Sequence, residues 1–355
     1  MPRDAATCAD DRVSRISELK PLINEYQVAS NGKALRQIAN TLGPYLFLWF
    51  LMYLSLQVSW WLVVPIAVLA GAFLVRIFII FHDCGHGSYF SSPRANTIMG
   101  FFCGMLVFTP YEQWRREHAA HHATAGNLDR RGLGDMWTMT VDEYQQASLW
   151  KRILYRVMRN PFFLFVIAPV YMFIVSQRIP SRSTQRRERR SIWQMNLAVF
   201  VMVSAMMAIF GVVPYIVIQL IVIAIGGSAG FWLFYVQHQF EGVYWERDEN
   251  WDFIDAALLG SSFYKLPGIL QWFSGNIGFH HIHHLGPRIP NYNLERCHDS
   301  HPMFREVPAI TLISSLSAMS VHLWDESSHR LVAFRELAAL APCCERQGST
   351  PSSAG

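Results

Sequence analysis

The sequence contains few charged residues for its length. Of its 355 residues, 16% are Asp, Glu, Lys or Arg, whereas 52% are hydrophobic and 14% are aromatic. A water-soluble domain carries about 25% charged residues, so this shortfall argues against a soluble globular protein and favours an integral membrane protein. The formal net charge of +4 is also small, and we expect no nucleic-acid partner.

Cysteine is sparse as well. The six cysteines form no CxxC pair and have no regular spacing, which argues against a disulfide framework and fits reduced thiols in the cytoplasm or membrane. Residues 1–41 are polar and contain no short apolar stretch with a small-residue cleavage site, so we expect no signal peptide. The sequence has no internal repeats, and we expect the terminal QGSTPSSAG to be disordered.

Two long apolar blocks are present, Thr41–Phe81 and Met195–Tyr235. Each would measure roughly 60 Å as one helix, twice the hydrocarbon core of a bilayer at about 30 Å. We therefore divide each block into two spans. The first breaks near Gln57–Trp61, where two tryptophans suit a membrane interface, and the second breaks at Gly211–Pro214.

Two shorter apolar stretches, residues 97–109 and 161–176, are too short for ordinary spans and are interpreted as re-entrant or interfacial segments. Arginines and lysines precede the second stretch, and RIPSRSTQRRERR (178–190) follows it. If this stretch crossed, one basic group would face outward, against the positive-inside rule. We expect four spans in two hairpins, with both termini cytoplasmic, in the plasma membrane if the chain is bacterial.

The expected fold is an all-α integral membrane protein with a cytosolic helical cap. Residues 1–41 form a cytosolic N-terminal segment, and residues 42–237 form the membrane domain. The cap spans residues 238–342, and residues 343–355 form a disordered tail.

Histidines gather where the expected spans end. Of fourteen histidines, nine fall in HDCGH (82–86), HAAHH (118–122) and HHIHH (280–284), and a lone one, His238, lies in YVQHQF. Side chains at i, i+3 and i+4 share one face of a helix. This register selects eight candidate metal ligands and leaves His281 about 100° away; the lone His238 is added as a ninth candidate. The nine are His82, His86, His118, His121, His122, His238, His280, His283 and His284.

Nine imidazoles are more than one ion can use, and two metals with four or five nitrogens each would use them all. Imidazole suits zinc, copper, iron and nickel, so the ligand type alone does not name the metal. A surface position would explain any single histidine but not three clusters at ligand spacing. We retain that interpretation for four histidines of the C-terminal region: His298, His301, His322 and His329.

Three alternatives could also account for the clustered histidines and nearby carboxylates. A carboxylate-based di-iron site would use the two E-x-x-H motifs, Glu295/His298 and Glu326/His329, but needs glutamates from two further helices that the sequence does not supply. A metal transporter would place ligands inside the spans, which here contain no histidine or carboxylate. A hydroxylase or ketolase on the same scaffold remains open.

The three clusters, in order, resemble the HxxxH, HxxHH and HxxHH boxes of the integral-membrane fatty acid desaturases and their hydroxylase relatives. The stretches HDCGHGSYF, HHATAGNLDRRGLGDMWTMTVDEY, YVQHQFEGVYW and NIGFHHIHHLGPRIPNYNLERCH resemble the acyl-lipid, omega-6 or Δ12-like branch and related bacterial enzymes. The resemblance covers roughly residues 20–310. It implies two iron ions held by the nine histidines, with O₂ as co-substrate, and desaturation of a membrane-lipid acyl chain.

The resemblance also implies further residues and partners. Five residues are candidates to orient the imidazoles, a ligand or water: Asp83, Asp129, Asp135, Glu241 and Asn276. We expect aromatic residues around 231–253 and the stretch LLGSSFYKLP (258–267) to line the acyl channel. No fused cytochrome b5 domain is expected, so electrons would come from a separate donor such as a ferredoxin or a cytochrome. The arginine-rich residues 182–190 are a candidate docking segment for an acidic donor.

Overall fold

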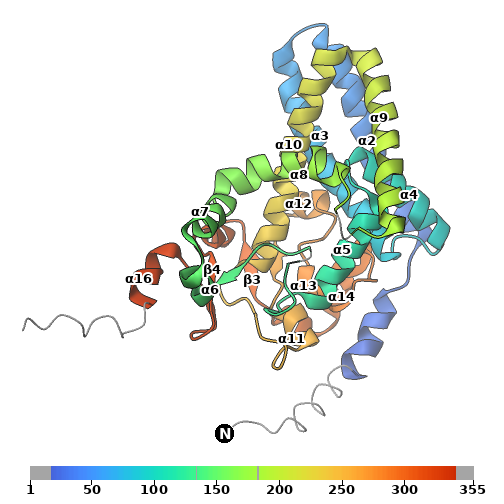
Figure 1. Ribbon diagram of the computed structural model, residues 1–355. Coiled ribbons are helices and arrows are strands. Elements are labelled where there is room, and N and C mark those ends of the chain that lie inside the picture. Colours follow the sequence, from blue (N-terminus) through green and yellow to red (C-terminus); the bar gives the residue numbers. More distant parts are fainter. Residues whose placement is uncertain (1–16, 133, 182–183, 341–355) are drawn as a thin grey trace, which may run out of the picture.

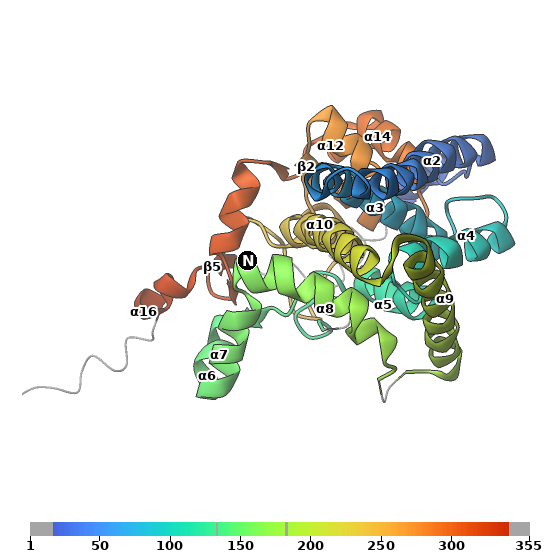
Figure 2. The same cartoon turned by 90° about the horizontal axis from the view of Figure 1, so that it is seen from above.

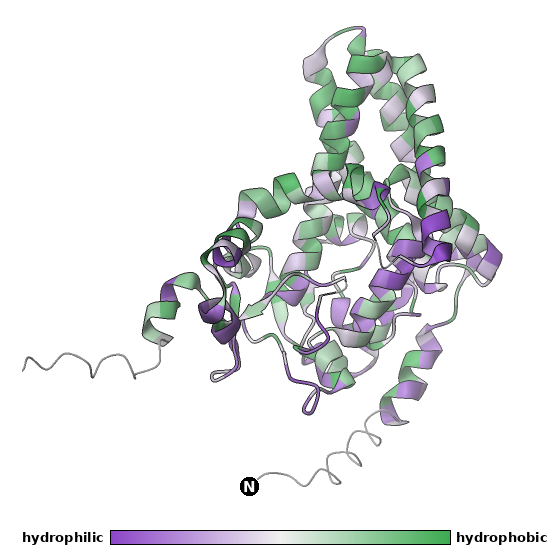
Figure 3. Cartoon of the chain, in the orientation of Figure 1, coloured by the Kyte–Doolittle hydropathy of each residue, from purple (hydrophilic) through white to green (hydrophobic). Residues whose placement is uncertain are grey.

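The computed structural model describes residues 17–132, 134–181 and 184–340. Four long helices stand side by side, and shorter helices with a few small strands form a cap below them (Figure 1). Hydrophobic residues prevail along the long helices, and hydrophilic residues gather in the cap (Figure 3). The tail predicted to be disordered, residues 343–355, lies outside the described residues.

Four helices in the described ranges are long and apolar enough to span a membrane: α2 (Asn31–Leu56), α3 (Trp60–His86), α9 (Arg186–Phe210) and α10 (Val212–His238). The two predicted hairpins are thereby confirmed. The Ser59 hydroxyl accepts a hydrogen bond from the Trp61 N–H and caps α3 at the first break. At the second break Gly211 has φ +85°, which a residue with a Cβ atom rarely adopts.

The shorter apolar stretches lie near the base of the four long helices. Residues 97–109 mostly belong to α4 (Pro93–Leu106). Residues 161–176 follow α7 (Leu149–Met158). They form most of a second helical segment, which consists of η1 (Phe163–Ile167), α8 (Ala168–Ile174) and η2 (Ser176–Arg178). The axis of this segment is bent by 63° relative to α7. By length and composition this bent pair could form a fifth span. In Figure 1, however, α8 runs across the bundle rather than along it, as an interfacial segment would.

The cap combines distant parts of the chain. Its helices are α5 (Tyr111–Thr124), α6 (Val141–Gln146), α7, α11 (Phe253–Leu258), α12 (Gly268–Phe273), α13 (His280–Leu285), α14 (Asn291–Ser300), α15 (Pro302–Arg305), η3 (Ser314–Ser320), η4 (Phe334–Glu336) and α16 (Leu337–Leu340). Residues 17–26 are also helical. Viewed from above, α12 and α14 lie on one side of α10, and α5 and α8 lie on the other (Figure 2).

Five short strands in the cap were not predicted. They are β1 (Met139–Thr140), β2 (Phe263–Lys265), β3 (Ala309–Thr311), β4 (Leu323–Asp325) and β5 (Arg330–Val332). β4 lies between β1, to which it is parallel, and β5, to which it is antiparallel; β2 and β3 form a separate parallel pair. Strands of two or three residues are too short to show an alternating pattern in the sequence, and β1 and β4 pair across 184 residues, from Met139 to Leu323.

The core of the bundle is centred on α3. This helix packs against α2, α4 and α10, and its inner face buries Ile77, Ile80 and Phe81. By contrast, α9 leaves large side chains such as Leu197 and Phe200 about two-thirds exposed, at 65% and 68%. An exposed apolar surface of this kind is expected where a helix faces lipid. Because α3 is held from several sides, its last turn is a rigid platform for the first histidine cluster.

Candidate metal centre

Four helices bring the clustered histidines together. The first cluster occupies the last turn of α3, which ends where Gly87 adopts φ +69°. The second lies on α5, His238 is the last residue of α10, and the third cluster lies on α13. Because i and i+4 positions share a helix face, each helix points its histidines toward the same region.

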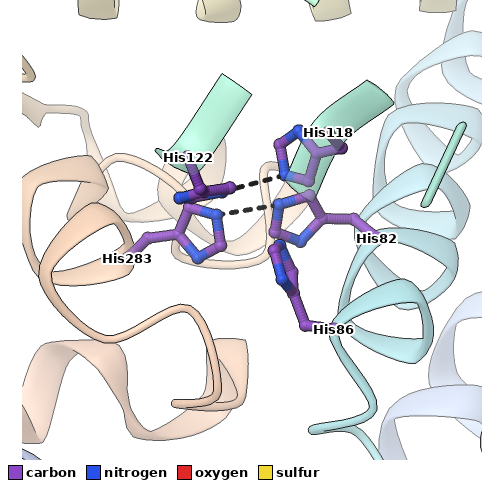
Figure 4. A group of neighbouring side chains, drawn as sticks. All are labelled: His82, His86, His118, His122 and His283. Atoms are coloured by element: carbon purple, nitrogen blue, oxygen red, sulfur yellow. Dashed lines mark hydrogen bonds between the residues drawn. The ribbon is translucent and has the colours of Figure 1, made fainter. Parts of the chain in front are cut away.

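The nine predicted ligands form two groups; each histidine offers one ring nitrogen, and within a group these nitrogens all lie within 4.8 Å of one another. The five-histidine group, shown in Figure 4, contains His82, His86, His118, His122 and His283. The four-histidine group contains His121, His238, His280 and His284. The second and third clusters each contribute to both groups, so the groups lie side by side.

Ring nitrogens converge within each group. In the five-histidine group, Nε2 of His82 lies 3.0 Å from Nε2 of His283. In the four-histidine group, Nε2 of His238 lies 3.2 Å from Nε2 of His121 and 2.9 Å from Nε2 of His280. Nitrogens that share an ion at about 2.0–2.1 Å are expected roughly 3 Å apart. The spacing therefore fits two sets of ligands facing two ions.

The electrostatic environment favours the neutral form of five of the cap imidazoles. Burial, and then repulsion among neighbouring imidazoles, lowers the pKa of five of them well below the usual histidine value: His118, His122, His280, His283 and His284. A neutral imidazole has a lone pair free for a metal, and a bound cation offsets the cost of burying so many ring nitrogens. The donor set therefore fits metal ions well.

Two of the acidic candidates contact imidazoles. Asp83 Oδ1 lies 3.0 Å from Nδ1 of His82, and Asp135 Oδ1 lies 2.5 Å from Nδ1 of His121. A carboxylate on Nδ1 holds the proton there and leaves Nε2 free to bind a metal. The backbone oxygen of Gly260 lies 3.2 Å from Nδ1 of His238 and would act on that ring in the same way.

The other three candidates have different positions. Asp129 is not placed to orient an imidazole, because its carboxylate pairs with Arg247 and accepts a hydrogen bond from the Asp248 N–H. Glu241 is exposed. Asn276 has φ +62° and donates a hydrogen bond to the Asn291 backbone oxygen. These three residues were candidates because they lie near the histidine clusters in the sequence, which does not show which way the loops turn.

The remaining histidines include one correction. His298, interpreted from the sequence as a surface residue, is buried, and its Nδ1 lies 3.1 Å from Nε2 of His281. Nε2 of His281 also lies 2.9 Å from the Phe304 backbone oxygen. Burial lowers the pKa of His281 to about 3. His281 therefore faces α14 and α15, away from both groups, as the helical register predicted.

The two E-x-x-H motifs do not form a carboxylate site. Glu326 is bound to Arg247, and Nδ1 of His329 lies 3.3 Å from Glu246. His298, from the other motif, contacts His281 instead. Within the described ranges, both histidine groups are composed of imidazoles alone.

A cavity of about 350 Å³ adjoins the histidines. His82, His118 and His280 line it, and apolar residues of α3, α8 and α10 form most of its remaining wall. Phe231 and Phe234 line the cavity as predicted, whereas residues 258–267 do not. That stretch instead forms β2 and the turn before it, and buried Tyr264 packs in the cap.

Sequence reasoning missed two features of this region. Asn291 donates hydrogen bonds to Oδ2 of Asp83 from both its backbone N–H and its side-chain amide. Three glycines in GGSAG (226–230) line the cavity from α10. The glycine run was a visible signal, because clustered small residues in a span indicate close helix packing.

Comparisons with known proteins agree with this geometry. The profile of the fatty acid desaturase family matches residues 59–310. The chain is 48% identical, over 86% of each chain, to a fatty acid desaturase of Bacillus subtilis. It is 24% identical to an sn-1 oleoyl-lipid 12-desaturase and 25% identical to an sn-1 acyl-lipid omega-3 desaturase (ferredoxin), both of Synechocystis, over 79% and 67% of each chain respectively. With its buried histidine groups and four candidate spans, the protein belongs to the membrane fatty acid desaturases, and it is an oxidoreductase.

Proposed function

We propose that each histidine group holds one iron ion and that the substrate is an acyl chain of a membrane lipid. The observation that carries this proposal is the position of the cavity. It is lined by three of the clustered histidines and also by helices that are long and apolar enough to cross a membrane. A lipid chain in the cavity would therefore lie against both groups.

When bound, iron supplies the activation of O₂ that removes two hydrogens from neighbouring methylenes. The overall reaction converts –CH₂–CH₂–, O₂, two electrons and two protons into –CH=CH– and two waters. The chain's own residues supply position and environment. Asp83 and Asp135 hold protons on Nδ1 of His82 and His121, which fixes the tautomers. The apolar wall around Phe231 and Phe234 excludes water and holds one C–C bond in place.

The relatives' names support a proposal for the acyl carrier and the electron donor. Two of the relatives are named as acyl-lipid desaturases that use ferredoxin, and we infer a lipid-bound substrate and a separate ferredoxin or cytochrome donor. An acidic donor would meet a basic surface at the start of α9. There Arg187 is 74% exposed although it pairs with Glu112.

We infer that the cap and both termini are cytoplasmic. The basic residues of α7 and the start of α9 lie at the cap end of the bundle (Figures 1 and 3), and positive charge favours the cytoplasmic side. In a bacterium this membrane would be the plasma membrane.

Metal analysis and lipid profiling test the proposal together. Protein purified after iron-replete expression should contain about two irons per chain, the number of ligand groups. Expression in a host without polyunsaturated lipids should yield new double bonds in its membrane lipids. His121→Ala and His283→Ala, one from each group, should abolish the product without preventing membrane insertion. Zinc in place of iron, or a hydroxylated product, would contradict it.

A further inference from the structure

Three glycines on α10 face three different surroundings. A Cβ atom at Gly226 would lie 3.0 Å from the backbone oxygen of Gly71 on α3. A Cβ atom at Gly227 would lie 2.9 Å from Pro169 Cβ on α8. These two glycines allow α3 and α8 to approach α10 closely, as small residues do between membrane helices.

Gly230, one turn further along α10, does not serve this packing. Among the described residues, no atom outside its own stretch of helix lies within 4 Å of a Cβ built on it, yet it lines the cavity. The absent side chain therefore leaves free space in the cavity rather than a contact between helices. Eight residues separate Gly230 from His238, which places it roughly 12 Å from that histidine along the helix.

The cavity continues past Gly230 in one direction. Ile223 on α10 and Leu74 on α3 also line it, and both precede their helix's histidines by at least two turns. Both helices run from the far end of the bundle toward the cap (Figure 1), so this part of the cavity lies deeper in the membrane than the metal groups. In a bilayer the methyl end of a lipid chain lies deepest. A lipid chain that entered this cavity from the histidine end would therefore extend its methyl end beyond Gly230.

We propose that Gly230 determines how long an acyl chain the enzyme accepts, by leaving space for the methyl-terminal part of the chain to pass. This inference rests on the proposed function, because it takes the cavity to be the acyl site. A larger side chain at this position divides the cavity between the histidines and Ile223. Long acyl chains then no longer fit in the cavity, whereas acyl chains that end before Gly230 still bind.

The expected effect is large in specificity and small in stability. One methylene that an apolar pocket cannot accommodate changes kcat/KM by about 10–200-fold. Gly230→Ala adds one carbon in open space and replaces glycine with the best helix former, so the variant should fold at least as well as the wild type. Gly230→Val and Gly230→Leu fill progressively more of the same space in the cavity.

The experiment compares Gly230→Ala, Gly230→Val and Gly230→Leu in reconstituted enzyme. The probes are phosphatidylglycerols that differ only in acyl-chain length. The ratio of kcat/KM for long chains to that for short chains should fall progressively, by roughly tenfold or more at Leu, while iron content and short-chain turnover stay near wild type. Ala229→Leu is the matched control, because it places the same leucine side chain on α10 at a residue that does not line the cavity.

Each outcome decides a separate question. An unchanged chain-length ratio in a folded Gly230→Leu variant, with turnover intact, would overturn the role of Gly230 and leave the proposed function standing. An equal shift in Ala229→Leu would also overturn it, because the effect would then belong to the helix as a whole. Absence of any desaturated product from the iron-loaded wild type would instead contradict the proposed function.

Discussion

Replacing Asp83 by asparagine tests how the chain prepares a histidine for metal. Oδ1 of this carboxylate faces Nδ1 of His82 at 3.0 Å. Oδ2 accepts hydrogen bonds from the backbone N–H and side-chain amide of Asn291, at 2.6 and 2.8 Å. The carboxylate is buried, with 1% of the residue exposed, so water cannot replace any of these partners.

Asparagine has the same shape but only one acceptor oxygen. Keeping both bonds from Asn291 turns its NH₂ group toward His82, and Nδ1 must then accept a hydrogen bond rather than donate one. The ring proton moves to Nε2, the atom that lies 3.0 Å from Nε2 of His283, and blocks its lone pair. Loss of such a partner typically lowers metal affinity by 10–100-fold, or about 1.4–2.7 kcal/mol.

The direct assay measures the iron content per chain after dialysis against a weak chelator. The melting temperature of the iron-free protein shows whether the variant is still folded. We expect Asp83→Asn to lose iron from the five-histidine group while the iron-free protein still folds. Asp129→Asn is the control, since Asp129 pairs with Arg247, and it should keep both irons. Full iron content and normal turnover in Asp83→Asn would refute the tautomer argument.

The other predictions concern three separate positions. His238→Gln keeps a hydrogen-bonding side chain but is a poor iron ligand, so we expect most of the activity and one iron to be lost; near-normal values would make His238 structural. His281→Ala should lower the free energy of unfolding, measured by calorimetry, by about 2–4 kcal/mol, because it leaves a cavity and removes a partner of the Phe304 carbonyl. Metal analysis should show that this variant keeps its iron. We expect His283→Ala to lose iron. An equal loss from His281→Ala would contradict the separation of His281 from the two histidine groups. A cysteine at exposed Arg189, in a variant without the native cysteines, should resist an impermeant thiol reagent until the membrane is opened; labelling of intact cells would contradict the cytoplasmic cap.

Local spacing explains why the candidate ligands could be read from the sequence. Side chains at i, i+3 and i+4 share a helix face whatever surrounds the helix, and the structure places all nine selected histidines in the two groups. The same register separated His281 from its neighbours, and its contacts with His298 and Phe304 agree. The number of membrane spans could also be predicted locally, by comparing the length of each apolar block with the thickness of a bilayer.

Only the tertiary structure decided how the histidines are shared. His121 belongs to one group while His118 and His122 belong to the other, because His118 and His122 lie beside histidines of α3 and His121 lies beside the last residue of α10. The positions of the acidic residues could not be predicted for the same reason: Asp83 and Asp135 reach imidazoles, whereas Asp129 meets Arg247. Such contacts depend on the approach of segments far apart in the chain.

The sequence alone therefore determined the composition of the site and its place at the ends of the spans, because helix periodicity and hydrophobic length act over a few turns. The tertiary structure decided which histidines share a group, which carboxylates contact them, and where the cavity lies. Gly226 and Gly227 are in close contact with α3 and α8, whereas Gly230, one turn further along, faces open space. That space is a product of helix packing, which no local pattern of residues specifies.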